Sequence, residues 1–228
     1  MEKFHILKMV GYSYHFWHGG MNMKLLNYIG IILMAIGLFM GSYYAMEWYK
    51  GKSSAQQLTK EELKSLENIQ DNQLSYETPV TSQVPSSQTE HKEGEKVALL
   101  HIPKIKKKFS IYWGADETTL KKGVGMFVSD LTTTPSGGGH TVLSGHRDTV
   151  FTDLGELKEK DTLVLEYDNK IYTYEIQKTW ITHADDRTVI IKKEEPILTL
   201  TTCYPFDYIG DAPDRYIIEA KLTASYSK

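Results

Sequence analysis

The chain has 228 residues, of which 26 are Lys or Arg and 29 are Asp or Glu, so its formal net charge is −3. Because there is no basic excess, the composition argues against a nucleic-acid-binding protein. The single cysteine, Cys203, excludes a disulfide within the chain, and the length allows one ordinary domain with additional segments.

An uncharged apolar run occupies residues 25–46. It is long enough to cross a hydrocarbon core of roughly 30 Å. No small-residue cleavage site follows it, so we expect a retained transmembrane anchor and not a cleaved signal peptide. Five lysines flank the run: Lys3, Lys8, Lys24, Lys50 and Lys52. Their distribution favours an N-terminus inside the cell and a bulk outside. A buried helix of a globular domain is the alternative.

Residues 1–24 precede the anchor and are expected to be cytoplasmic. Residues 1–20 show neither helical nor strand periodicity, and Met21 and Met23 lie just before the anchor. We therefore hypothesise that translation starts at one of these two methionines. An intact-protein mass that includes residues 1–20 would refute this start.

Residues 47–96 are polar and are expected to form a spacer. Within them, Thr59 and Glu62 fit a capping box that precedes apolar residues at helical spacing, which predicts a short helix over about 59–72. Residues 77–95 are rich in Ser, Thr, Pro and Glu, a composition typical of a disordered segment.

Short β-type runs follow one another in residues 97–228, which we expect to form the folded domain. The predicted strands are 97–102, 125–128, 141–144, 162–167, 170–180, 197–202 and 215–222. A helical turn is predicted at 117–121, a hairpin turn at Asp168 and Asn169, and a solvated turn at the lysine-rich residues 104–108. Strands at this spacing, with few helices, predict a closed or nearly closed antiparallel β-barrel.

Cys203 lies at the end of a predicted strand, because Pro205 cannot donate a hydrogen bond to a central ladder. Arg215 begins the next predicted strand. If the two strands pair antiparallel, the thiol and the guanidinium lie at the same edge of the sheet. A lone cysteine is usually a small buried hydrophobic residue, but its place beside a polar loop favours a reactive thiol.

A thiol attacks as its thiolate and needs a base or a cation beside it to do so near neutral pH. Of the eight histidines, His146 is the best placed, since it directly follows the predicted strand 141–144 and a glycine. Arg215 offers a charged donor for a substrate oxygen. The alternatives are a surface histidine for His146 and, for Arg215, an ion pair with a nearby aspartate. Arg147 competes for the donor role.

No zinc-binding spacing is present, because one cysteine and scattered histidines do not provide it. The acidic pairs Asp185–Asp186 and Glu194–Glu195 could attract calcium if a loop brought them together. A solvated acidic face is the simpler interpretation.

Residues 143–146 read Leu-Ser-Gly-His, residues 199–203 read Thr-Leu-Thr-Thr-Cys, and Arg215 follows twelve residues after the cysteine. This combination resembles the sortase family of transpeptidases from Gram-positive bacteria. Residues 144–151 and 202–216 resemble class D in particular, and the resemblance extends over roughly 97–222. It implies a mainly β protein, an eight-stranded sortase-type β-barrel with short helices, preceded by an N-terminal transmembrane helix and a polar spacer.

The resemblance also implies that His146, Cys203 and Arg215 are the catalytic residues, with no metal or cofactor required. The expected substrates are secreted proteins with a C-terminal Leu-Pro-x-Thr-Gly or Leu-Pro-x-Thr-Ala sorting signal, cleaved after Thr. The expected acceptor is a cell-wall peptide amine, diaminopimelate. The enzyme would be anchored in the cell membrane with its catalytic domain outside.

For substrate binding we expect Ser144, Thr199, Thr201 and Thr202, together with the loop 182–196. Thr199 and Thr201 share a face of the strand with Cys203 by the period of two. Two functional alternatives stay open. One is a membrane-tethered cysteine peptidase that ends in hydrolysis, and the other is a non-catalytic surface β-barrel that binds a partner.

Overall fold

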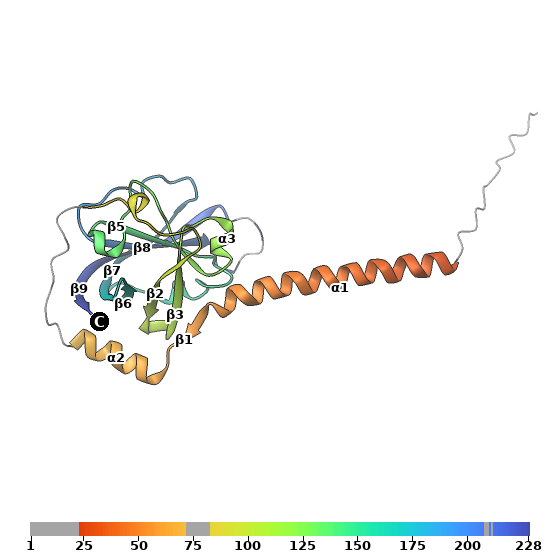
Figure 1. Ribbon diagram of the computed structural model, residues 1–228, viewed down its shortest axis with the longest axis horizontal. Helices are drawn as coiled ribbons and strands as arrows, with labels where there is room; N and C mark the ends of the chain where they lie inside the picture. The colour runs from red at the N-terminus through yellow and green to blue at the C-terminus, as the bar shows by residue number, and fades with distance from the viewer. Residues whose placement is uncertain (1–22, 72–82, 208–209, 211) are drawn as a thin grey trace, which may run out of the picture. The chain divides into compact units, whose positions relative to one another are not determined.

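A computed structural model describes residues 23–71, 83–207, 210 and 212–228 (Figure 1). Residues 1–20, on which the start-site hypothesis rests, lie outside the described residues, as does part of the predicted disordered segment. The chain divides into two compact units, Met1–Tyr44 and Ala45–Lys228. Helix α1 (Met23–Ser53) carries the apolar run, is long and apolar enough to cross a membrane, and buries none of that run in the protein.

Eight of the described strands close a mixed β-barrel in the second unit (Figure 1). They are β2 (Lys96–Ile102), β3 (Lys107–Trp113), β4 (Val124–Met126), β5 (His140–Ser144), β6 (Thr162–Tyr167), β7 (Lys170–His183), β8 (Ile197–Tyr204) and β9 (Asp214–Ser227). Their order is β3-β2-β6-β7-β9-β8-β5-β4, and pairing of β4 with β3 completes the circle. The prediction of an eight-stranded barrel is confirmed.

Two of the strand pairs are parallel, namely β3–β4 and β5–β8. The expectation of an antiparallel barrel was therefore wrong for these pairs. Parallel neighbours need a connection that crosses from one end of the sheet to the other. Here the segment between β3 and β4 contains the short helix α3 (Glu117–Leu120), and β5 and β8 are separated by the whole β6–β7 hairpin.

The lysine-rich stretch hid a strand from the sequence analysis. A turn does occur at the 3₁₀ helix η2 (Pro103–Ile105), but β3 follows it at once. Phe109, Ile111 and Trp113 alternate along β3 and are buried, while the residues between them are half-buried. This alternation indicates a strand, but the lysines before it led to the prediction of a solvated turn.

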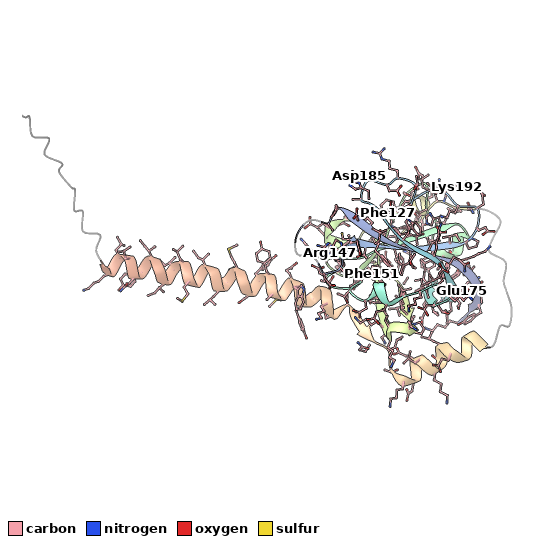
Figure 2. All side chains as sticks on the ribbon, turned by 180° about the vertical axis from the view of Figure 1, so that it is seen from behind. Phe127, Arg147, Phe151, Glu175, Asp185 and Lys192 are labelled. Carbon is pink, nitrogen blue, oxygen red and sulfur yellow. The ribbon has the colours of Figure 1, made fainter. Side chains whose placement is uncertain are left out.

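The barrel interior is filled by large apolar side chains. Phe151, which follows β5, lies within the folded unit (labelled in Figure 2). It meets Phe109 of β3 edge to face, with ring centroids 5.7 Å apart. Leu198 and Leu200 on β8 are fully buried in the same core, as is Ile218 on β9. Burial of each such side chain stabilises the fold by about 1.5–3 kcal/mol. Thr199, Thr201 and Cys203 alternate with these leucines along β8, so their side chains lie on the other face of the strand.

The part of the predicted spacer that the structure describes contains three complete elements, and one of them, the 3₁₀ helix η1 (Ser86–Gln88), lies within the segment predicted to be disordered. Strand β1 (Ala55–Gln57) pairs with β3, and helix α2 (Lys60–Asp71) follows. The capping box is confirmed, because the Thr59 amide donates to Glu62 and the Glu62 amide donates to the Thr59 hydroxyl. Leu58 and Leu66 pack with Val164 of β6 and Ile171 of β7.

Candidate active site

Three neighbouring strands, β5, β8 and β9, carry the predicted catalytic residues to one end of the barrel. Cys203 and Arg215 are direct partners in the antiparallel β8–β9 register. In the parallel β5–β8 register, Ser144 pairs with Thr201, so His146 and Cys203 each lie two residues beyond that pair. The prediction that the two strands flanking the loop pair antiparallel is confirmed, and this pairing brings the sulfur and the guanidinium together. The parallel pairing of β5 with β8 brings the imidazole to the same region.

A cavity of about 410 Å³ opens at this end of the barrel. His146, Cys203 and Arg215 all line it, and Ser144, Thr201 and Thr202 line it too. The thiol of Cys203 is free and partly exposed, which leaves it accessible to a ligand in the cavity. The cavity therefore joins a nucleophile, a candidate acid–base and a cationic hydrogen-bond donor.

Gly145 determines how His146 leaves strand β5. A side chain at position 145 would lie 2.7 Å from the ring of Phe151 and 2.8 Å from Val150. The chain then turns, and the Phe151 amide donates to the His146 carbonyl at 3.0 Å. Glycine thus allows the backbone to pack on the core phenylalanine while the histidine side chain faces the cavity.

The two arginines that competed for the donor role have different surroundings. Arg147 donates to the carbonyls of Pro205 and Gly210, at 3.1 and 2.6 Å, and so holds the loop that follows Cys203. Arg215 lines the cavity and donates to the carbonyls of Ala212 and Asp214, at 3.2 and 2.9 Å. Arg215 is therefore the better candidate for contact with substrate.

The placement of Thr199 in the substrate groove was wrong. Its side chain is fully buried, and its hydroxyl lies 2.8 Å from Nε2 of His140. Thr199 does share a strand face with Thr201 and Cys203, as the period of two requires. The loop between β7 and β8, however, covers this face at the level of Thr199, where His140 also contacts the Ile191 carbonyl.

The other three predicted binding residues lie at the cavity, with differing exposure. Ser144 and Thr201 are partly exposed there. Thr202 is only 3% exposed, and its hydroxyl donates to the Gly145 carbonyl at 2.7 Å. Thr202 therefore joins the ends of β8 and β5, and its hydroxyl already has a partner.

The predicted recognition loop supplies one wall of the cavity. Thr182, His183, Ala184, Asp186, Val189 and Ile190 belong to the lining. Three further lining residues, Ala115, Leu120 and Phe127, were not predicted from the sequence. Leu120 belongs to α3, whose N-cap Asp116 accepts bonds from Thr118 and Thr119. An Asp followed by two threonines was a readable cap signal, but nothing local showed that this helix reaches the cavity.

Asp186, one of the acidic loop residues, has protein partners. Asp186 accepts hydrogen bonds from Thr182 and Thr188, and these bonds hold the pKa of its carboxyl below the usual value. Within the described part of the chain, no group of three or more His, Cys, Asp and Glu side chains gathers as a metal ion would require. The calcium hypothesis for Asp185, Asp186, Glu194 and Glu195 therefore gains no support.

The sortase domain family model matches residues 100–223. Sortase D of Bacillus subtilis (strain 168) is 46% identical over 129 residues, which cover 56% of this chain and 64% of that protein. The match therefore spans less than two thirds of the length of this relative.

Solved structures of sortases are similar to this chain as well. The catalytic domain of B. anthracis SrtD is 93% identical with a TM-score of 0.55, over 63% of this chain and 97% of that one. A Clostridium perfringens Sortase D5 transpeptidase is 29% identical with a TM-score of 0.53, over 59% and 83%. Since the family model matches more than half of the chain and these relatives are of class D, the chain belongs to the sortase family, class D.

Proposed function

We propose that the chain is a membrane-anchored cysteine transpeptidase that cleaves a Leu-Pro-x-Thr-Gly or Leu-Pro-x-Thr-Ala sorting signal after Thr. The observation that carries this proposal is the meeting of Cys203, His146 and Arg215 around one cavity. An extended peptide in this cavity would present its Thr carbonyl to the sulfur. Residues 97–228 would form the catalytic domain, and residues 25–46 the anchor.

In the first half of the reaction, the Cys203 thiolate attacks the Thr carbonyl carbon, and the carbon–sulfur bond forms. Arg215 donates to the oxygen as negative charge develops on it. When the tetrahedral intermediate collapses, the peptide C–N bond breaks, and the imidazolium of His146 gives its proton to the departing amine. The products are a thioacyl-enzyme and the C-terminal fragment of the signal.

In the second half, an amine attacks the thioacyl carbon and His146 takes the proton from that amine. A new amide forms, and the Cys203 thiolate leaves. The acceptor in this proposal is a cell-wall peptide amine, diaminopimelate, which lies outside the membrane. Residues 1–24 would therefore face the cytoplasm, and the barrel would face the wall.

Mass spectrometry of the enzyme with sorting-signal peptides tests this function. Wild-type protein should gain the mass of the acyl fragment ending in Thr, and should release a ligated product when an amine is supplied. Cys203→Ala should form neither, while its circular dichroism spectrum stays that of wild type. Hydrolysis alone at saturating amine would point to a peptidase. Turnover by Cys203→Ala would overturn the catalytic assignment.

A further inference from the structure

His140 occupies an unusual position for a buried histidine. It begins β5, the strand that leads to His146, and it is 1% exposed. Its Nδ1 lies 2.7 Å from the carbonyl oxygen of Ile191, and its Nε2 lies 2.8 Å from the hydroxyl of Thr199. Both ring nitrogens therefore have a partner, one on the β7–β8 loop and one on β8.

The partners fix the protonation of this ring. A carbonyl oxygen only accepts hydrogen bonds, so Nδ1 carries the hydrogen and donates to Ile191. In the neutral ring Nε2 has a free lone pair, and it accepts from the Thr199 hydroxyl. Burial lowers the pKa of His140, which agrees with a neutral ring. The result is a chain of two bonds from β8 through His140 to the loop.

The loop depends on such bonds because it contains no regular helix or strand between His183 and Ile197. Its residues Val189 and Ile190 line the cavity directly before the bonded Ile191 carbonyl. Two further attachments follow. The Gln83 amide donates to the carbonyls of Lys193 and Glu194, both at 3.0 Å, and Lys193 pairs with Glu219 of β9 at 2.6 Å.

These attachments differ in where they act. The bonds from Gln83 and Glu219 hold the far side of the loop, at residues 193–194. The bond from His140 acts one residue from the wall, and it originates from the two strands that position His146 and Cys203. A shift of His140 would therefore move the apolar wall relative to the nucleophile, without a change in the nucleophile itself.

We propose that His140 is a positioning residue, which holds the Val189–Ile190 wall at a fixed distance from Cys203 and so sets the affinity of the enzyme for its peptide. This inference rests on the proposed function for its kinetic part only. The structural part, that His140 immobilises the loop 184–196, stands independently of any activity.

The test compares His140→Ala with His140→Asn and Thr199→Val in the full chain. His140→Ala loses both bonds, His140→Asn retains a donor for the Ile191 carbonyl, and Thr199→Val loses only the bond to Nε2. In His140→Ala, amide hydrogen exchange in residues 184–196 should rise about tenfold, as the loss of one or two hydrogen bonds allows. His140→Asn should recover most of this protection, and Thr199→Val should lie between wild type and His140→Ala.

Kinetics with a sorting-signal peptide provide the second measurement. KM should rise about tenfold in His140→Ala with kcat changed less than about threefold, because the variant loses binding and not chemistry. Alkylation of Cys203 by iodoacetamide should keep its wild-type rate. His101→Ala is the matched control, since His101 is also buried but lies beside Glu166 on β6. It should leave loop exchange and KM unchanged.

Three results would overturn the proposal. They are unchanged exchange in residues 184–196, an exchange increase spread equally over the barrel strands in Thr199→Val and His140→Asn, or a fall in kcat at constant KM. A wild-type enzyme that does not cleave the peptide would instead refute the proposed function. In that case the exchange data would still decide whether His140 holds the loop.

Discussion

Arg215 and Cys203 face each other across the β8–β9 ladder, and this pairing leads to a prediction at the scale of single residues. Arg215→Ala should lower kcat/KM for a sorting-signal peptide by roughly 100-fold, because loss of one donor to a developing oxyanion costs about 3 kcal/mol. Its bonds in the free enzyme go to the carbonyls of Ala212 in the loop and of Asp214, the first residue of β9, so the fold should persist. Steady-state kinetics and circular dichroism check both points.

Arg147→Ala is the matched control for this prediction. Arg147 lies three residues after β5, whereas Arg215 is the second residue of β9, and Arg147 binds the carbonyls of Pro205 and Gly210. Its loss should loosen the loop after Cys203 and reduce kcat/KM less than the loss of Arg215. An unfolded Arg215→Ala protein would assign Arg215 a structural role. A larger loss of kcat/KM in Arg147→Ala would contradict the assignment of Arg215 as the donor to the oxyanion.

The residues of the candidate site could be predicted where chemistry coincides with a strand end. His146, Cys203 and Arg215 each adjoin a β-type run and a loop in the sequence, and register then aligns them. The prediction that Thr199 binds substrate failed because the exposure of this side chain depends on a loop that begins fifteen residues earlier in the chain. The two-residue period reports the face of a strand, but not what covers that face.

At the scale of elements, three strands are joined by contacts of the Glu166 carboxylate away from the cavity. Glu166 on β6 lies 2.9 Å from Nε2 of His101 on β2, and 2.7 Å from Nζ of Lys228, directly after β9. His101 is the main reason that the pKa of Glu166 falls to about 2, and Lys228 adds to the effect. The carboxylate therefore stabilises the association of β2, β6 and the C-terminus.

This cluster predicts a pH dependence of stability. The pKa of Glu166 is lower in the folded protein than the unfolded value of about 4.3, so its contribution is present above pH ~4.3 and is lost as the pH falls toward 2. Glu166→Gln should lower the free energy of unfolding at pH 7 by about 1–3 kcal/mol. The difference from wild type should shrink between pH 5 and pH 3, approximately, in urea titrations.

Glu195→Gln is the control, because Glu195 pairs with Lys221 at 2.8 Å but is 64% exposed. An exposed pair of this kind contributes about 0–1 kcal/mol, so this variant should show little change at either pH. A difference between wild type and Glu166→Gln that stays constant from neutral to acid pH would contradict the assignment of this stability to the Glu166 carboxylate.

Strands with clear alternation could be predicted from the sequence, but the strands with which they pair could not. The β6–β7 hairpin was predicted because Asp168 and Asn169 connect two adjacent strands, and both residues have positive φ. The parallel pairs β3–β4 and β5–β8 could not be predicted, since no local pattern specifies which distant strands lie together. The closed barrel followed from strand number and spacing, whereas its mixed character required the tertiary structure.

At the scale of the whole molecule, the two compact units differ in how much of their apolar surface is exposed. The first unit contains most of α1, on which many large apolar side chains, including Ile31, Leu33 and Phe39, are more than half exposed. The second unit has its own core and includes β1 and α2, which pack on the barrel. Exposure of so many apolar side chains on one helix is stable in a lipid environment and not in water.

This contrast predicts that a chain starting at Ala45 folds and remains in solution, whereas the full chain binds membranes. The shorter chain should show cooperative thermal unfolding and should cleave a sorting-signal peptide at the full-length rate, because the cavity belongs to the second unit alone. Only the full chain should float with phosphatidylcholine vesicles in a density gradient.

A chain starting at Gln83, which lacks β1 and α2, is the informative comparison. It should stay in solution but unfold at a lower temperature, because Leu58 and Leu66 no longer cover Val164 and Ile171. Flotation of the chain starting at Ala45 would show that the barrel itself binds lipid, and α1 would then not be sufficient to explain anchoring.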